Sequence, residues 1–156
     1  MKRYFPWIIA AFFCPTLVAA ATEDEVLGVW LTEDQHGLVL FEHCGTSICG
    51  KLAGMDPSLA GDGTALRDNL NPDSTARNQL LCGLAILHIL WNAERHNWEG
   101  SIYDPASGKT YSSAVSILPT GALRLRGYIT HFPIFGRTET WSRYRGSLYS
   151  DCRMHG

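Results

Sequence analysis

Residues 68–77 form the most polar motif of the sequence, and their carboxylate, amide and guanidinium groups could bind a cation or a polar head group at a lid or rim. Asn69, Asn71 and Asp73 alternate as in some calcium loops, but the glycine and the distal bidentate glutamate of such loops are missing. Asx turns that fix a long loop explain the same residues. In this second interpretation, which we favour, Arg77 bridges the carboxylates of Asp68 and Asp73.

A second polar group surrounds a predicted hairpin turn at residues 104–108, which has proline in its second place and glycine at its end. Tyr103 and Asp104 precede the turn and Tyr111 follows it. The two tyrosines could line a cavity and offer their hydroxyls to a ligand. Cross-strand aromatic packing beside a turn explains them equally well, and it is the commoner arrangement.

The histidines show no metal-binding spacing to one another, and none of the motifs of the common hydrolases, zinc proteases or P-loop enzymes is present. His43 next to Cys44 could form a nucleophile–base pair, but a cysteine in a disulfide has no thiolate to offer. We therefore assign no catalytic residue, cofactor or metal, and we expect the protein not to be an enzyme.

Four cysteines follow the N-terminal segment, and they allow three pairings. Cys44 and Cys49 flank a hairpin-sized connection, which makes them a natural local pair. Cys82 and Cys152 would then pair with each other and tie a mid-chain loop to the C-terminal tail. The alternative is that one or both of the latter are free thiols. The spacing matches no zinc signature.

The N-terminus has the layout of a cleaved secretory signal, with a basic start, an apolar run at residues 5–18 and small residues before a cut at Thr22. A membrane anchor is the competing interpretation, but the run is short and interrupted by prolines. A lipid anchor would need a cysteine at the cut, whereas Cys14 follows two phenylalanines. We predict a signal peptide at residues 1–21, no stable membrane anchor after cleavage, and one exported domain at residues 22–156.

The charge balance argues against a nucleic-acid partner. The chain has 13 Lys and Arg against 15 Asp and Glu, a net charge of −2, and removal of Lys2 and Arg3 makes it −4. The arginines are scattered and form no stripe that could follow a phosphate backbone.

Short apolar segments separated by turn residues predict eight strands, although periodicity alone does not distinguish residues 84–91 from a buried helix. Residues 55–80 are a long connection without clear periodicity, and residues 137–143 place Arg137, Glu139, Trp141 and Arg143 on one face of the last strand. The predicted strands span residues 26–33, 38–44, 48–54, 84–91, 98–103, 109–118, 122–129 and 137–144. This pattern favours an antiparallel barrel or sandwich, and a closed eight-stranded barrel has room for one small ligand.

Six motifs follow one another along the chain: Gly28-Val29-Trp30-Leu31-Thr32-Glu33-Asp34, residues 44–50, residues 68–73 with Arg77, residues 102–105 with 108–111, Leu125-Arg126-Gly127 and Thr140-Trp141-Ser142-Arg143. Together and in this order they resemble an exported bacterial family known only as a domain of unknown function, number 2147. The resemblance covers nearly all of the chain after the signal segment. It implies a small lipocalin-like (calycin-type) antiparallel β-barrel located in the periplasm or secreted, with no established activity.

The resemblance also implies roles for individual residues. In the lipocalin pattern an arginine from the closing strand packs on the tryptophan of the Gly-x-Trp start, which pairs Arg143 with Trp30 here; Trp141 shares the face of Arg143. We include Arg126 of the Arg-Gly step among the ligand or loop candidates. Where the family pattern leads us to expect a cysteine after this step, the chain has Tyr128.

The predicted function is the binding of a small, partly apolar molecule inside an exported barrel. The alternatives are a cell-envelope interaction module with a filled barrel, in which the 55–80 loop contacts a partner, and an uncharacterised barrel enzyme. The sequence does not determine the oligomeric state. The predicted cavity walls are Leu40, Phe41, Ile86, Leu87, Trp91, Ile102, Tyr111, Val115 and Leu125.

Overall fold

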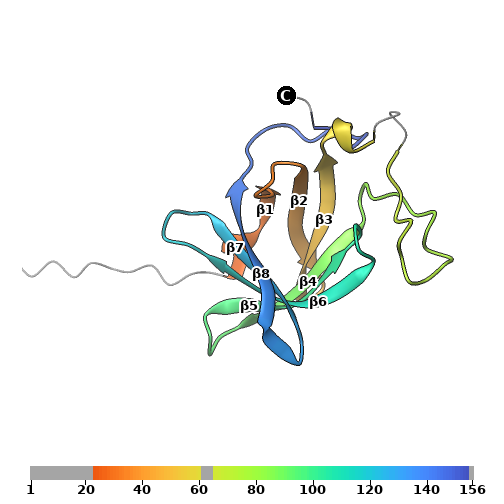
Figure 1. Cartoon of the computed structure of the whole chain (residues 1–156). Helices are drawn as coiled ribbons and strands as arrows, with labels where there is room; N and C mark the ends of the chain where they lie inside the picture. The colour runs from red at the N-terminus through yellow and green to blue at the C-terminus, as the bar shows by residue number, and fades with distance from the viewer. Residues whose placement is uncertain (1–22, 61–64, 155–156) are drawn as a thin grey trace, which may run out of the picture.

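The chain folds into a closed antiparallel barrel of eight strands, as predicted (Figure 1). The computed structural model describes residues 23–60 and 65–154, so the predicted signal peptide lies outside it. Each strand pairs with the next along the sequence, and β1 pairs with β8 to close the sheet. The strands are β1 Gly28–Leu31, β2 Gly37–Cys44, β3 Ser47–Met55, β4 Ala85–Asn92, β5 Asn97–Asp104, β6 Lys109–Ile117, β7 Leu123–Ile129 and β8 Phe132–Arg143.

The hydrophobic core occupies the barrel interior because alternate residues of each strand point inward. Trp98 on β5 pairs with Val115 on β6, and both are almost completely buried. Val115 pairs in turn with Leu125 on β7, and the pattern continues around the sheet. Leu40 lies between the buried residues Val39 and Phe41 on β2, and the same alternation places it on the outer face. The prediction that Leu40 lines the cavity is therefore wrong.

The first strand begins later than predicted, because residues 23–26 form a short 3-10 helix, η1 (Glu23–Val26). Gly28 has a φ of +110°, which lets the chain change direction between η1 and β1 at no steric cost. A side chain at this position would also meet Arg143 Nη1 at 2.9 Å.

The last strand begins earlier than predicted, at Phe132 instead of Arg137. Pro133 and Gly136 lie between the two predicted strands at residues 122–129 and 137–144, where they favour a break in the chain. The ladder pairs Ile129 with Phe132 and Tyr128 with Gly136, which leaves residues 133–135 in a bulge outside the regular register. Proline is tolerated at such a bulge because its missing N–H has no ladder partner to satisfy.

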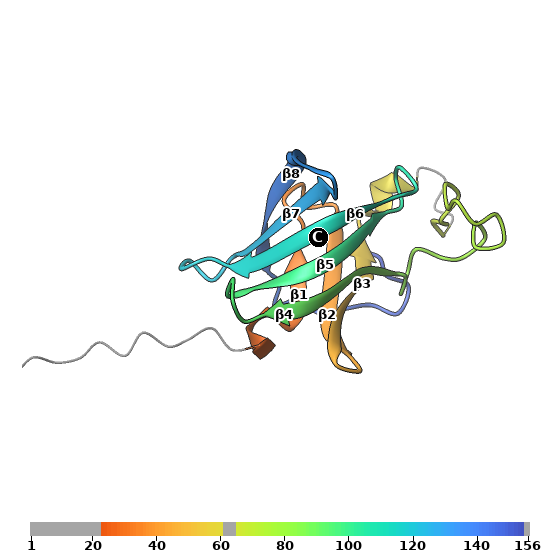
Figure 2. The same ribbon diagram turned by 90° about the horizontal axis from the view of Figure 1, so that it is seen from below.

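The connection from β3 to β4 lies to one side of the barrel, as Figure 2 shows, and includes the short helix η2 (Pro57–Leu59). A disulfide joins Cys82 near the end of this connection to Cys152 in the C-terminal tail. The tail is also hydrogen-bonded to β3, because the Met55 N–H donates to the Cys152 carbonyl at 2.8 Å. No helix within residues 23–60 and 65–154 is long and apolar enough to cross a bilayer.

Candidate functional site

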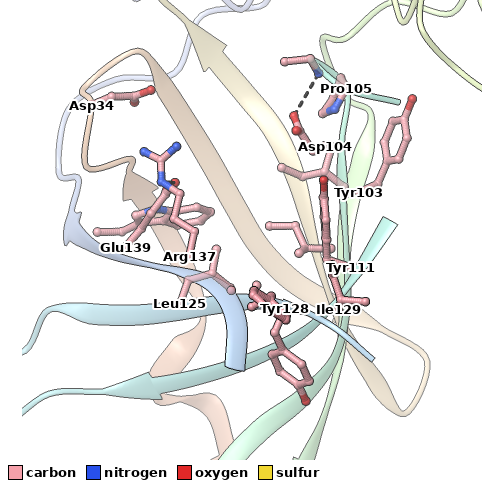
Figure 3. Close-up of a pocket in the computed structure, with 17 residues that line it drawn as sticks. Asp34, Tyr103, Asp104, Pro105, Tyr111, Leu125, Tyr128, Ile129, Arg137 and Glu139 are labelled. Carbon is pink, nitrogen blue, oxygen red and sulfur yellow. Dashed lines mark hydrogen bonds and ion pairs between the residues drawn. The ribbon is translucent and has the colours of Figure 1, made fainter. Parts of the chain in front are cut away.

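A cavity of about 610 Å³ opens at the end of the barrel where three hairpin turns meet. Asp34 from the β1–β2 turn and Asp104 at the end of β5 border it (Figure 3), as does Phe135 from the β7–β8 hairpin. Its other lining residues are Ile86, Ile102, Tyr103, Pro105, Ala106, Tyr111, Leu125, Gly127, Tyr128, Ile129, Gly136, Arg137, Glu139 and Trp141.

Apolar side chains from β4, β5, β7 and β8 form the inner wall of the cavity. Ile86, Ile102 and Leu125 line it as predicted, and a register shift in the β3–β4 ladder lies next to Ile86. Gly127 leaves space on β7, because a Cβ built there meets only Ile102 Cγ2, at 3.7 Å. Trp141 is buried and packs edge-to-face on Phe41 at 6.2 Å between ring centroids. The inner wall therefore suits an apolar group.

The polar side of the cavity comes from β8. Arg137 Nε lies 3.0 Å from Glu139 Oε1, and Trp141 Nε1 donates to Glu139 Oε2 at 2.8 Å. The Glu139 carboxylate is therefore fixed by two donors, while the Arg137 side chain is 76% exposed. Both side chains share the inward face of β8 with Trp141, as the alternation predicts.

The two aspartates at the mouth stabilise their own turns. Asp104 accepts from the Ala106 N–H at 3.0 Å and from Ser107 Oγ at 2.6 Å. Burial alone would raise the pKa of Asp34, but hydrogen bonds from the Thr32 hydroxyl and the backbone N–H of His36 hold that pKa below its usual value. The lowered pKa keeps Asp34 negatively charged at the rim around neutral pH.

Tyr103 borders the cavity, but its hydroxyl serves the long loop. It donates to Asp68 Oδ1 at 2.6 Å, and Asn71 Nδ2 donates to Asp68 Oδ2 at 2.6 Å. Asp68 is completely buried. Burial and the bond to Asp68 raise the pKa of Tyr103 to about 12. This pair fixes the 65–84 segment against the β5–β6 hairpin.

The rest of the 68–77 motif forms turns and lies away from the cavity. Asp73 accepts from the Thr75 N–H and hydroxyl, at 2.9 and 2.7 Å, and Asn71 Oδ1 accepts from the Asp73 N–H. Arg77 Nε donates to the Asn71 carbonyl at 2.8 Å, so the expectation that it bridges carboxylates is wrong. The turn interpretation accounts for these contacts, and none of the four candidate residues of this motif lines the cavity.

Several other predicted residues lie elsewhere. Arg126 donates to Thr138 Oγ1 at 3.2 Å and to the Pro133 carbonyl at 2.8 Å, so it supports the β7–β8 hairpin and does not line the cavity. Trp91 borders a smaller cavity of about 240 Å³, beside Trp98 and His43. The predicted wall residues that lie in the packed core instead are Phe41, Leu87 and Val115.

Trp30 and Arg143 join the two closing strands. They are register partners, and the Arg143 guanidinium carbon lies 4.0 Å from the centroid of the Trp30 ring. Arg143 also donates to the carbonyls of Leu27 and Glu25, at 2.6 and 2.7 Å. Because these contacts tie Arg143 on β8 to Trp30 on β1 and to the backbone of residues 25–27, this cluster serves closure of the barrel.

One group of possible metal ligands occurs among the described residues: the ligand atoms of Cys44, Cys49 and His88 lie within 4.8 Å of one another. Cys49 and His88 are register partners on β3 and β4. Cys44 and Cys49 are joined in a disulfide, so neither sulfur is a thiolate that could bind a metal.

The cavity residues that sequence reasoning missed include Asp34, Tyr128, Phe135, Arg137 and Glu139. The alternation of Arg137, Glu139 and Trp141 on one face was a usable signal for two of them. A charged face normally points to solvent in an antiparallel sheet, and only an interior cavity reverses that expectation.

The comparisons with known proteins agree with this architecture. A solved structure described as "Protein HP1028 from the human pathogen Helicobacter pylori belongs to the lipocalin family" is 21% identical, with a TM-score of 0.63. The alignment covers 76% of this chain and 82% of that chain, and it supports a lipocalin-like fold. No match was found among curated proteins. The sequence profile of a bacterial family matches residues 28–143, and the chain therefore belongs to that family, the uncharacterized proteins conserved in bacteria of DUF2147.

Proposed function

We propose that the protein binds a small amphipathic molecule inside its barrel. The observation that carries the proposal is the open cavity of about 610 Å³, with an apolar inner wall and charged groups at its mouth. Small-molecule sites commonly have volumes of about 300–1,000 Å³ and combine an apolar lining with a few fixed polar groups. A barrel with a filled interior, as the interaction-module alternative requires, would offer no such space.

The lining suggests how a ligand would lie. Its apolar part would pack on Ile102, Leu125 and Trp141, where burial from water is favourable. Its polar group would remain at the mouth near Arg137, whose guanidinium contacts Glu139 through Nε and is otherwise largely exposed. Asp34 and Asp104 accept hydrogen bonds within their own turns, whereas Arg137 is a cationic donor. Arg137 is therefore the best candidate at the mouth to bind a carboxylate or another acceptor.

Binding fits the titration behaviour of the cavity better than proton-transfer catalysis does. The pKa of Asp34 is lowered and that of Tyr103 is raised to about 12, so both move away from neutral pH. A general acid or base works best with a pKa near the working pH. These shifts support binding over acid–base chemistry.

Location outside the cytoplasm, in the periplasm or secreted, belongs to the same proposal. The two disulfides, Cys44–Cys49 and Cys82–Cys152, support it, because such bonds persist in oxidising compartments. Mass spectrometry of the exported protein would test it, with an N-terminus at Thr22 as the expected result.

A fluorescent fatty acid, cis-parinaric acid, is the probe that tests binding. The purified protein should enhance its emission, and Gly127→Leu should abolish the enhancement by filling the cavity. The variant should fold, because the new Cβ makes an ordinary contact and the φ of Gly127 is not left-handed. Ala114→Leu adds a similar side chain next to the buried Val115 on β6, where alternation directs it outward, and should bind normally.

Equal enhancement by the wild type and Gly127→Leu, with both folded by circular dichroism, would contradict binding in this cavity. Native mass spectrometry of protein purified from its own host gives a second readout. A carried small molecule that disappears in Gly127→Leu is the expected result.

A further inference from the structure

The β7–β8 hairpin carries a group of exposed apolar side chains that the fold does not need. Phe132, Ile134 and Phe135 are 59, 80 and 61% exposed, and Ile129 across the turn is 48% exposed. Four large apolar side chains thus lie exposed within seven residues. Such a concentration on a protein surface usually marks an interaction site.

The backbone makes these side chains protrude. The register jumps from the pair Ile129–Phe132 to the pair Tyr128–Gly136, so residues 133–135 bulge out of the ladder. Arg126 holds the bulge through the Pro133 carbonyl, at 2.8 Å. In Figure 1 the blue hairpin end of β8 reaches the lower edge of the molecule. The apolar group is therefore a narrow supported tip, which we call the hairpin tip (residues 129–135).

The charge around the hairpin tip differs from that of the whole protein. Residues 124–138 contain three arginines and one histidine and no Asp or Glu, although the chain has a net charge of −2. Glu139 pairs with Arg137, while Arg126 bonds only neutral oxygens in its hydrogen bonds to Thr138 and Pro133. An apolar tip with a basic border matches a bilayer surface with anionic lipids.

The hairpin tip also borders the mouth of the cavity, since Ile129 and Phe135 line both. A protein that docks through this tip would hold its cavity mouth close to the membrane surface. A tip of seven residues is small compared with the roughly 20–30 residues per side of a standard protein–protein interface. A bilayer requires no complementary partner surface, so it fits this feature better.

We propose that the hairpin tip docks the protein on lipid bilayers containing anionic lipids and places the cavity mouth at the membrane surface. Phe132 and Ile134 enter the interfacial region, and the nearby arginines contact anionic headgroups. The net negative charge of the remaining protein favours the orientation with the tip toward the membrane. The docking stands on the tip alone, and only the use of the cavity mouth as a ligand site at the membrane rests on the proposed function.

Vesicle flotation tests the proposal. The purified protein should float with vesicles of equal parts phosphatidylcholine and phosphatidylglycerol, and less with phosphatidylcholine alone. The double variant Phe132→Ser/Ile134→Ser should lose roughly tenfold or more in partitioning, because two apolar side chains no longer leave water. Leu90→Ser is the matched control, because Leu90 is 50% exposed on β4 and should have no effect.

Neither Phe132 nor Ile134 lines the cavity, so the double variant should bind cis-parinaric acid in solution like the wild type. This separates the two proposals. If the wild type binds the probe but does not float with vesicles, the docking proposal is wrong and the cavity function is unaffected. If the wild type floats but does not bind the probe, the cavity function is wrong and the docking proposal is unaffected.

Three further results would overturn docking through the tip. The first is equal flotation of the wild type and the double variant. The second is equal loss in Leu90→Ser, which indicates unspecific adhesion. The third is a wild type that forms a dimer and does not bind vesicles, together with a double variant that forms no dimer. A second copy of the chain would then cover the tip.

Discussion

At the residue scale, Asp68 shows how a single buried carboxylate positions a long connection. It is fully buried, and its two oxygens accept from Tyr103 and Asn71, each at 2.6 Å. Bonds to an ionised acceptor are short and strong, and a buried acceptor that loses one is costly. The Asp68–Tyr103 bond spans 35 positions of the sequence and therefore depends on the tertiary fold.

We predict that Tyr103→Phe lowers the free energy of unfolding by about 1–3 kcal/mol, because the buried carboxylate loses a donor. Urea unfolding at neutral pH measures the change. Tyr111→Phe is the matched control on the adjoining strand and should change stability less. Equal losses of unfolding free energy in both variants would mean that the hydrogen bond to Asp68 makes no particular contribution to stability.

The raised pKa of Tyr103 gives a separate prediction at alkaline pH. The unfolded chain releases the phenolic proton near pH 10, whereas the folded chain keeps it up to about pH 12. The stabilisation from Tyr103 is therefore complete below pH 10 and is lost as the pH rises to about 12. A spectrophotometric titration should show a late tyrosinate phase that Tyr103→Phe lacks; the same late phase in the variant would contradict the assignment.

Ser113 gives the opposite expectation. It is completely buried on β6 between Gly100 and Gly127 of the neighbouring strands, and its hydroxyl has no hydrogen-bond partner within the part of the chain that the structure describes. We predict that Ser113→Ala leaves stability unchanged or raises it by about 1 kcal/mol, because an unsatisfied buried hydroxyl is removed. Thermal unfolding measures this. A clear loss of stability would reveal a partner for the hydroxyl.

At the element scale, the closing pair β1–β8 has only two register pairs, Trp30–Arg143 and Leu31–Ser142. Arg143 compensates for this short ladder by stacking on Trp30 and bonding two carbonyls beside η1. A planar guanidinium can make all three contacts at once, whereas a lysine ammonium cannot.

We therefore predict that Arg143→Lys lowers the free energy of unfolding by about 2–3 kcal/mol, despite keeping the charge. Hydrogen exchange should accelerate in residues 23–31, because η1 and β1 lose their tie to β8. Arg124→Lys on the outer face of β7 is the control and should have little effect. Uniform acceleration across the barrel would instead indicate a global loss of stability without local opening at the closure.

The elements also show how far sequence reasoning reaches. The predicted strand positions agree with the structure to within about two residues for most strands, because turn residues and period-2 alternation are local signals. The start of β8 was missed, since the tolerance of Pro133 depends on a bulge against Tyr128. The polar face of β8 could be read from the sequence. Whether this face borders a cavity depends on the curvature of the whole sheet.

At the scale of the whole molecule, the number of strands made a closed barrel predictable, while the volume left inside was not. Ile86, Ile102, Tyr111 and Leu125 line the cavity, whereas Phe41, Leu87 and Val115 belong to the buried core and do not border it. These side chains are of similar type, so composition alone does not separate the residues that border the cavity from those that fill the interior. The difference arises where Gly127 contributes no side chain.

The two disulfides constrain the whole molecule unequally. Cys44–Cys49 closes a separation of 5 residues, and Cys82–Cys152 closes one of 70. In the chain-entropy description, the stabilisation grows with the loop that the bond closes. We predict that Cys82→Ser/Cys152→Ser costs about 4 kcal/mol of unfolding free energy and Cys44→Ser/Cys49→Ser about 2 kcal/mol.

Urea unfolding of the two double variants under non-reducing conditions measures this difference, and each variant serves as the control for the other. The longer bond also ties the tail to the β3–β4 connection, so its loss should increase hydrogen exchange at Met55, whose N–H donates to the Cys152 carbonyl. If removing either disulfide lowers the unfolding free energy equally, the tail remains docked through its backbone hydrogen bonds alone. The constraint on the unfolded chain would then not determine the stability of this barrel.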